Sequence, residues 1–533
     1  MTHQVKSVLL LDGVDPVCGQ LLAKAGIQVT TKGKLTKDEL LKEIKEYDGV
    51  IIRSATKVTD EVLQAGARLR IIGRAGVGVD NVDVDAATRR GVIVMNTPSG
   101  NTLSAAEQTC ALICSLSRSI PQACTSLKEG KWDRKAFMGT ELYGKTLAII
   151  GLGRIGREVA KRMQSFGMTT IGYDPMVPAN VSAEWGVESL SLEDIWPRAD
   201  YITVHTPLLP HTKNLIGEAV FKVCKKGVYV VNVARGGIVD EAALLAALQS
   251  GVCGGAALDV FVQEPPTDFT LCKHPKVICT PHLGANTVEA QRRVAVEIAE
   301  QIVDMVNGKT LVGVINAPAL TNSTSEICKP WIELGKALGH LGSRLSQPTD
   351  ASSLALSIEL FGSEVSGMKT FLGSAILVGL LKGMTQAGVN MVNAPGVAQD
   401  MGIKISVEAH PNKQPSVSSA APDALQLKIT TGSKDHTLLG NCAGGQPTLH
   451  VLDGCVWESG LPLGRNMLFF SASPTASPLA AIATQLVGLR APLTSILSSA
   501  PTQKEVWHVA RTTVAVDNTL VIPDAKLVAQ VTF

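Results

Sequence analysis

The chain has 533 residues, of which 45% are hydrophobic and 18% are charged. This composition excludes an intrinsically disordered protein and implies roughly two to four folded domains. The net charge of +2 argues against nucleic-acid and membrane partners, and the 11 cysteines are scattered without CxxC pairs. We therefore expect a cytoplasmic protein with reduced thiols and no bound metal, and we expect no membrane span because the most apolar stretch is too short.

The first hundred residues alternate short apolar runs with amphipathic segments of helical length. This rhythm predicts a doubly wound sheet of parallel strands, because β-α-β order requires crossovers that cover both faces. The expected strands are residues 5–11, 49–53, 69–72 and 92–95, and the expected intervening helices are residues 38–46 and 59–64.

A change of rhythm near Ser99 predicts a long connecting helix into a second lobe, ended by Pro121. The second lobe repeats the strand and helix alternation. It is followed by one strong amphipathic helix that begins near Val288 and is closed by Asn307 and Gly308, which returns the chain to the first lobe.

The remaining residues, after a polar linker at Asn316, form further modules. Their last segment predicts the order strand, helix, strand, strand, helix, with the final helix in the sequence "PDAKLVAQV". The predicted fold class is therefore α/β, with two doubly wound parallel-sheet lobes of the Rossmann or flavodoxin type followed by α+β modules.

The sequence "TLAIIGLGRIGREVAKR" places three glycines between an apolar strand and a helix. Gly151 permits the tight turn, Gly153 lets a pyrophosphate approach the backbone, and Gly156 lets the helix pack against the strand. A second strand ends at Asp174, 18 residues after Gly156, where a carboxylate can accept hydrogen bonds from a ribose diol and repel a ribose phosphate. This predicts NAD as the cofactor.

Four further apolar runs of the second lobe end in polar residues. These include Thr206, Arg235, Asp259 with the nearby Glu264, and His282. Because the carboxyl ends of parallel strands face one crevice, we expect the arginine, the glutamate and the histidine to converge beside the nicotinamide.

The sequences "GLGRIGREVAKR", "VNVARGGIVDEAAL", "ALDVFVQEPP" and "TPHLGANT" together resemble the D-isomer-specific 2-hydroxyacid dehydrogenases. The resemblance implies NAD-dependent oxidation of a phosphorylated 2-hydroxy acid, 3-phospho-D-glycerate, to 3-phosphooxypyruvate, the first committed step of L-serine biosynthesis. It also implies that His282 is the base that takes the hydroxyl proton, that Glu264 supports it, and that Arg235 orients the substrate.

The same resemblance implies the remaining site residues. For the cofactor these are Val77, Gly151, Gly153, Arg154, Ile155, Gly156, Asp174, Thr206, Val233, Ala234, Arg235, Asp259, His282, Leu283, Gly284 and Ala285. For the substrate they are Arg53, Ser54, Arg74, Gly76, Asn101 and Arg134. Arg134 is expected across a subunit boundary, which implies a homo-oligomer, a dimer of dimers.

The resemblance also implies four domains. They are a substrate-binding domain (residues 1–98 and 287–315), an NAD-binding domain (99–286), an intervening allosteric-type domain (316–455) and an ACT-like domain (456–533). Two other functions stay open at this point. One is a dehydrogenase for another 2-hydroxy acid, such as glycerate or 2-hydroxyglutarate, and the other is a dinucleotide-sensing corepressor of the same fold.

Overall fold

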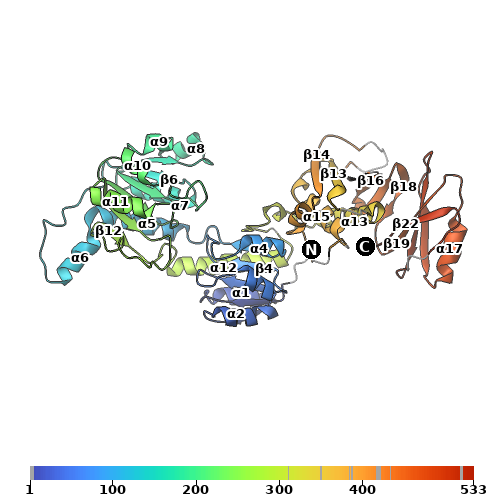
Figure 1. The fold of residues 1–533 in the computed structure, drawn as a ribbon, viewed down its shortest axis with the longest axis horizontal. Helices are drawn as coiled ribbons and strands as arrows, with labels where there is room; N and C mark the ends of the chain where they lie inside the picture. Colours follow the sequence, from blue (N-terminus) through green and yellow to red (C-terminus); the bar gives the residue numbers. More distant parts are fainter. Residues whose placement is uncertain are drawn as a thin grey trace.

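The described residues form four β-sheets, which are spread along an elongated molecule (Figure 1). The first sheet lies between the second, at the left of the view, and the two C-terminal sheets at the right. The computed structural model describes residues 5–309, 311–347, 351–382, 384–385, 388–415, 422–432, 434–516 and 520–533.

The first sheet is parallel throughout, as predicted, with the order β2-β1-β3-β4-β5. Its central strands β1, β3 and β4 are almost entirely buried on both faces, which is why they read as apolar runs. Strand β2 escaped prediction because its sequence, QVTT, is short and partly polar. The strands are β1 (Ser7–Leu10), β2 (Gln28–Thr31), β3 (Gly49–Ile52), β4 (Ile71–Arg74) and β5 (Ile93–Asn96).

Helices cover both faces of this sheet. The long helix α12 (Val288–Val306) returns from the second lobe as predicted, ends at Asn307, and packs on α1 and β4. The other helices of this lobe are α1 (Val17–Lys24), α2 (Lys37–Glu43) with its 3-10 extension η1 (Ile44–Glu46), α3 (Asp60–Ala65) and α4 (Val84–Arg89).

The second sheet has seven parallel strands in the order β12-β11-β10-β9-β6-β7-β8. The direction of winding reverses between β6 and β9, and the crevice at such a reversal is where ligands bind in doubly wound sheets. The strands are β6 (Thr146–Ile150), β7 (Thr169–Tyr173), β8 (Val187–Ser189), β9 (Tyr201–Val204), β10 (Val228–Asn232), β11 (Cys253–Leu258) and β12 (Val277–Cys279). The helices α7 (Arg154–Gln164), α8 (Ala179–Glu184), α9 (Leu192–Ile195), α10 (Glu218–Val223) and α11 (Glu241–Ser250) accompany them.

The predicted connecting helix is two helices, and the predicted role of Pro121 is wrong. Helix α5 (Thr102–Arg118) ends at Ser119, whose φ of 49° is left-handed, and α6 (Ile120–Lys128) begins directly after it. Pro121 lies in the first turn of α6, where its missing N–H costs no hydrogen bond. No residue of α6 is buried.

The third sheet is mixed and has the order β14-β13-β15-β16-β17-β18. The apolar stretch near residue 375 forms helix α15 (Lys369–Leu381), which is buried against α13 (Cys328–Ser346). Among the described residues, no helix combines the length and the apolar character that crossing a bilayer requires. The strands are β13 (Leu354–Phe361), β14 (Lys404–His410), β15 (Ala424–Thr431), β16 (Lys434–Asn441), β17 (Thr448–Leu452) and β18 (Cys455–Pro462).

Strand β18 starts at Cys455 and pairs with β17, so the predicted domain boundary between residues 455 and 456 falls at its first residue. The short helices α14 (Ser363–Ser366) and α16 (Ala394–Asp400) complete this module, together with the 3-10 turns η2 (Pro318–Leu320), η3 (Ala351–Ser353) and η4 (Ala443–Gly445).

The last sheet is antiparallel with the order β20-β21-β19-β22, and α17 (Leu479–Gly488) connects β19 (Asn466–Ala472) to β20 (Leu493–Ser498). The predicted final helix is wrong, because those residues form strand β22 (Ala525–Thr532). Ala529 and Val531 are buried while Lys526 and Thr532 are exposed, which is the two-residue period of a strand. With β21 (Val506–Thr512), the strand order is that of a split β-α-β arrangement, and the ACT-like domain stays a prediction.

Candidate active site

The glycine turn after β6 has the geometry of a dinucleotide site. Gly151 has a left-handed φ of +97°, and a Cβ there would lie 2.7 Å from the carbonyl oxygen of His205. A Cβ on Gly156 would lie 2.0 Å from the carbonyl oxygen of Gly151, so the helix packs closely on the strand. Gly153, the N-cap of α7, instead faces open space. A pyrophosphate fits there, beside the free N–H groups of the helix.

Two polar residues flank this turn. Asp174 follows β7, and its carboxylate accepts hydrogen bonds from the backbone N–H of Leu152 (2.9 Å) and of Met176 (2.8 Å). The carboxylate therefore also holds the glycine turn in place. Thr206 follows β9, and its buried hydroxyl has no hydrogen-bond partner within the described residues. An unpartnered buried hydroxyl at this position suits a bound cofactor.

His282 and Glu264 form the central pair of the crevice. Nδ1 of His282 lies 2.7 Å from Oε2 of Glu264, and the backbone N–H of Phe261 donates to Oε1 of the same carboxylate at 3.0 Å. Burial raises the pKa of Glu264, but the hydrogen bonds from His282 and Phe261, together with the charge of Arg235, outweigh burial and lower this pKa overall. Glu264 is thus held as a carboxylate that orients the imidazole.

Asp259 is a fully buried carboxylate that fixes the loop carrying His282. It accepts hydrogen bonds from the N–H of Leu283 (2.7 Å), from the N–H of Gly284 (2.8 Å) and from the hydroxyl of Thr280. Its own carbonyl oxygen accepts the N–H of His282, whose φ of 55° is left-handed. The imidazole therefore stands on a loop that is tied down on both sides.

Arg235 follows β10 and reaches toward the first lobe. Its Nε donates to Oδ2 of Asp80 at 2.9 Å, and its Nη1 donates to the carbonyl oxygen of Ala234 at 2.6 Å. The side-chain amide of Asn232 holds the backbone by donating to the carbonyl oxygen of Arg235 at 2.8 Å. The sequence predicted that Arg235 lies in the crevice, but it did not predict the hydrogen bond between Arg235 and Asp80.

The first lobe contributes a cluster of polar side chains with unsatisfied hydrogen-bonding capacity. The Nε atoms of Arg53 and Arg74 and the Oδ1 atom of Asn101 are buried and have no partner among the described residues. Burial and the charges of Arg235 and Arg53 lower the pKa of Arg74 to about 10. Cations crowded in this way favour a bound anion, which would supply acceptors for the two Nε–H groups, while the Oδ1 atom of Asn101 needs a donor.

The remaining predicted site residues lie in several parts of the two lobes. Ser54 is exposed beside Arg53, Gly76 lies against the guanidinium of Arg74, and the carbonyl oxygen of Val77 accepts from Asn96. Val233 and Gly284 pack together at the strand ends, and Ala234, Leu283 and Ala285 are their neighbours in sequence. Arg154 and Ile155 begin helix α7. Arg134, in contrast, is exposed in the segment after α6, and no described contact joins it to the other predicted substrate residues.

Two carboxylates at this site were missed from the sequence. Asp12, at the end of β1, accepts hydrogen bonds from the N–H of Arg53 (2.9 Å) and from the N–H and the hydroxyl of Thr56 (3.0 and 2.7 Å). Asp80 is the partner of Arg235. Asp12 follows an apolar strand in the same way as Asp174 does, so applying the strand-end rule to the first lobe would have found it.

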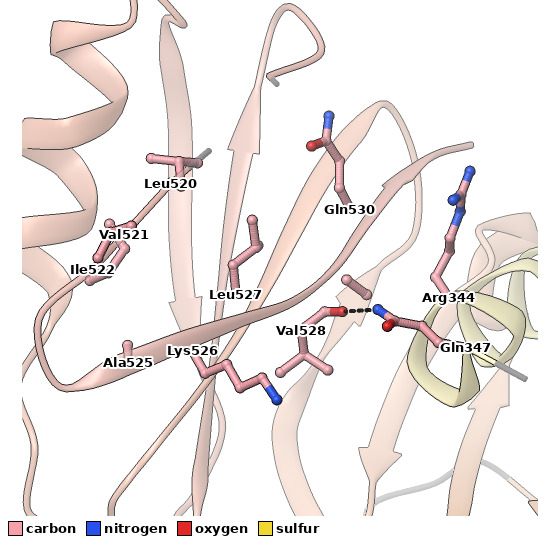
Figure 2. A pocket seen from close by; sticks show the side chains of 11 residues that line it. Arg344, Gln347, Leu520, Val521, Ile522, Ala525, Lys526, Leu527, Val528 and Gln530 are labelled. Atoms are coloured by element: carbon pink, nitrogen blue, oxygen red, sulfur yellow. Dashed lines mark hydrogen bonds between the residues drawn. The ribbon is translucent and has the colours of Figure 1, made fainter. Parts of the chain in front are cut away.

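A separate cavity of about 460 Å³ lies between α13 and β22, far along the chain from this crevice (Figure 2). Arg344 and Gln347 reach it from the end of α13, and Lys526 and Gln530 reach it from β22. The side-chain amide of Gln347 donates to the carbonyl oxygen of Val528 at 3.4 Å. None of the predicted site residues lines this cavity.

Comparisons with known proteins agree with this arrangement. Residues 110–284 match the model of the D-isomer specific 2-hydroxyacid dehydrogenase NAD binding domain, and residues 327–451 match the D-3-phosphoglycerate dehydrogenase intervening domain. The chain is 49% identical to the D-3-phosphoglycerate dehydrogenase of Sus scrofa over 95% of this chain and 94% of that protein. It is 43% identical to the Bacillus subtilis enzyme of the same name over 79% and 77% of the two chains.

Among solved structures, the chain is similar to a D-lactate dehydrogenase from Aquifex aeolicus complexed with NAD and lactic acid. The identity is 28% and the TM-score is 0.52, and the match covers 58% of this chain and 96% of the other. The similarity therefore reaches the two parallel-sheet lobes that hold the crevice.

Proposed function

The chain belongs to the D-3-phosphoglycerate dehydrogenases, a branch of the D-isomer specific 2-hydroxyacid dehydrogenases, and we propose that it oxidises 3-phospho-D-glycerate to 3-phosphooxypyruvate with NAD. This is the first committed step of L-serine biosynthesis. The observation that carries the proposal is the pairing of a carboxylate-backed imidazole on one lobe with buried, unpartnered arginine nitrogens on the other. One half suits proton removal and the other suits a phosphorylated acid.

His282 handles the proton in this proposal. Its Nδ1 hydrogen-bonds Glu264, so Nε2 is left to take the hydroxyl proton of the substrate. The carboxylate then stabilises the positive charge that the ring acquires. NAD, when bound, would accept the hydride that leaves C2 of the substrate.

The arginines bind and orient the substrate. Arg235 would hold the carboxylate and the oxygen at C2, because a guanidinium can donate two parallel hydrogen bonds. Arg53 and Arg74 would bind the phosphate, which would satisfy their buried unpartnered Nε atoms. Asn101 would contribute through its side-chain NH2 group, the part of the amide that can donate to a phosphate oxygen. A substrate held at both ends presents its C2 to the crevice in one orientation.

A substrate panel tests this proposal. NADH formation is measured at alkaline pH, where proton release is favoured, with 3-phospho-D-glycerate, D-glycerate, D-2-hydroxyglutarate and D-lactate. We expect kcat/KM for 3-phospho-D-glycerate to exceed the others by about 100-fold or more, since each charge-assisted hydrogen bond contributes roughly 1.5–3 kcal/mol. A preference for an unphosphorylated acid would reject the phosphate assignment, and turnover of none of them would favour a dinucleotide-sensing role.

The proposal also assigns a function to each domain of the chain. Residues 1–98 with 287–315 would bind the substrate, residues 99–286 would bind NAD, and residues 316–455 and 456–533 would form the intervening and ACT-like regulatory domains. Support comes from the four sheets, although β18 (Cys455–Pro462) joins the third sheet and so carries that module past residue 455, and from the family models matched at residues 110–284 and 327–451.

We further propose that the protein is a cytoplasmic homotetramer, formed as a dimer of dimers. Helix α6 buries none of its residues, and the segment after it exposes Trp132 (78%), Met138 (87%) and Tyr143 (79%). So much exposed apolar surface is typical of a subunit contact. Such a contact would carry Arg134 to the crevice of the partner subunit. Light scattering of the full chain measures the assembly, and a monomer with full activity would contradict this part.

A further inference from the structure

The loop that carries Asp80 is firmly attached to the first lobe. The side-chain amide of Asn81 donates to the carbonyl oxygens of Arg53 (2.7 Å) and Thr56 (2.6 Å). The side-chain amide of Asn96 donates to the carbonyl oxygen of Val77 at 2.6 Å. The loop is therefore fixed on both sides of Asp80, so its carboxylate projects from a rigid support.

From this support Asp80 reaches across to the other lobe. Its Oδ2 accepts the Nε–H of Arg235 at 2.9 Å, over a separation of 155 residues in sequence. The other end of the guanidinium lies against the same loop, because a Cβ on Gly78 would be only 1.8 Å from Nη2 of Arg235. With Nη1 on the carbonyl oxygen of Ala234, the guanidinium has one orientation.

The charge of Asp80 also suits this place. The charges of Arg235 and Arg53 lie close enough to Arg74 to disfavour its positive charge, and Asp80 is one of the carboxylates that offset this repulsion at Arg74. A guanidinium without such an anchor would turn away from the other two. Asp80 thus holds Arg235 through a directed hydrogen bond, while its charge acts on the neighbouring Arg74.

We propose that Asp80 is a positioning residue for catalysis, which holds the guanidinium of Arg235 by Nε so that the substrate carboxylate meets it in the reactive orientation. The hydrogen bond joins the two lobes across the crevice, so it sets Arg235 relative to Arg53 and Arg74. The inference rests on the proposed function, because it needs Arg235 to bind substrate. Asp80 itself contacts neither substrate nor cofactor in this role.

The experiment compares Asp80→Ala, which removes the acceptor, with Asp80→Asn, which keeps an oxygen for Nε. Asp85→Ala is the matched control, because Asp85 is an exposed aspartate in the first turn of the neighbouring helix α4. We expect Asp80→Ala to lower kcat by about 10- to 50-fold, as expected when an orienting contact is lost. Asp80→Asn should stay within about threefold of the wild type, and Asp85→Ala should be unchanged.

A second readout separates positioning from loss of folding. With substrate deuterated at C2, the isotope effect on kcat/KM should rise in Asp80→Ala, because misaligned substrate makes hydride transfer slower than the other steps. NADH affinity and the melting temperature Tm should stay close to the wild type. Equal isotope effects and equal kcat in wild type and Asp80→Ala would overturn the proposal, and so would an Asp80→Asn variant as impaired as Asp80→Ala.

A double-mutant cycle with Arg235→Lys keeps the inference testable whatever the size of the single effects. The lysine ammonium has no Nε–H on a planar fork, so Asp80→Ala should cost much less in that background than in the wild type. Equal costs in both backgrounds would overturn the proposal. If Arg235→Ala itself left activity intact, the proposed function would fail as well, whereas an impaired Arg235→Ala with an unimpaired Asp80→Ala rejects only the role of Asp80.

Discussion

The two sides of the crevice differ in how completely the protein satisfies its own polar groups. On the seven-stranded side, Glu264, Asp259 and Asp174 each accept two or more hydrogen bonds from the protein. On the five-stranded side, the Nε atoms of Arg53 and Arg74 are buried and have no partner among the described residues. In the proposed mechanism, the groups that handle the proton are therefore held by the protein itself, whereas the arginines that would bind the anion keep hydrogen-bonding capacity for it.

This contrast makes a general prediction about variants. A change on the seven-stranded side should reduce the rate of the chemical step, because it disturbs groups that act only as the reaction proceeds. A change to the unpartnered arginines of the five-stranded side should mainly weaken substrate binding, whereas Asp80 of that side acts through Arg235 and belongs with the first group. His282→Ala and Arg74→Met test this contrast directly, and Glu264→Gln and His205→Gln test smaller effects on the seven-stranded side.

His282→Ala should have the largest effect. Removing the base should lower kcat by about 10³- to 10⁴-fold, the upper part of the range for general acid–base catalysis. NADH binding, measured by fluorescence, should change little. The exposed His211 of the same lobe provides the control His211→Ala, which should keep full activity. A His282→Ala enzyme with normal kcat would remove the proton-transfer role.

Arg74→Met tests the five-stranded side. Loss of a charge-assisted contact worth roughly 1.5–3 kcal/mol should raise KM for 3-phospho-D-glycerate by about 10- to 100-fold, with a much smaller change in kcat. Turnover of unphosphorylated D-glycerate should be affected far less. Arg70→Met is the control, because Arg70 is an exposed arginine directly before the same strand. A fall in kcat with KM unchanged would break the contrast between the two sides.

Glu264→Gln should lower kcat by about tenfold, because the amide no longer stabilises a protonated imidazole. The folded-state pKa of Glu264 is lowered, so the carboxylate stabilises the fold above the usual glutamate range. This contribution is lost as the pH falls through the lowered folded-state value. Tm of the wild type should exceed that of the variant at neutral pH, and the gap should close in acid. A gap that widens in acid would contradict this assignment.

Replacing His205 should have the smallest effect, which is limited to the pH dependence of stability. Burial behind the glycine turn lowers its pKa to about 4 from 6.5, so the unfolded chain binds this proton more readily between those values. The stabilising contribution of neutral His205 is complete above about pH 6.5, and at pH 5 about 2 kcal/mol of it should be lost. A His205→Gln variant should show a flatter dependence of Tm on pH in this range, with kcat nearly unchanged. His211→Gln is the control, and an identical pH dependence in all three proteins would reject the role of His205.

The sequence predicted the parts of this molecule that depend on local pattern. Buried parallel strands read as apolar runs, and the residues that follow them, such as Asp174, Arg235 and His282, lie at one edge because parallel strands share their direction. The glycine turn between β6 and α7 was also predicted from a local pattern, the spacing of its three glycines. Strand β22 was mistaken for a helix because its alternation is short and follows a proline.

Other parts could not be predicted from spacing. The contact between Asp80 and Arg235 joins residues 155 positions apart on different lobes, and its existence depends on how the two lobes meet. Asp259 was predicted to bind the cofactor from resemblance, whereas its hydrogen bonds to Leu283 and Gly284 show that it fixes the histidine loop. Pairings of this kind come from tertiary packing, which a single sequence does not contain.

Direct transfer of label from substrate to cofactor tests the central claim. The protein is incubated with NAD and 3-phospho-D-glycerate deuterated at C2, and the NADH formed is analysed by mass spectrometry. If the crevice between His282 and the three arginines performs the proposed oxidation, each NADH should carry one deuterium. NADH without deuterium, or no NADH at all with this substrate, would contradict it.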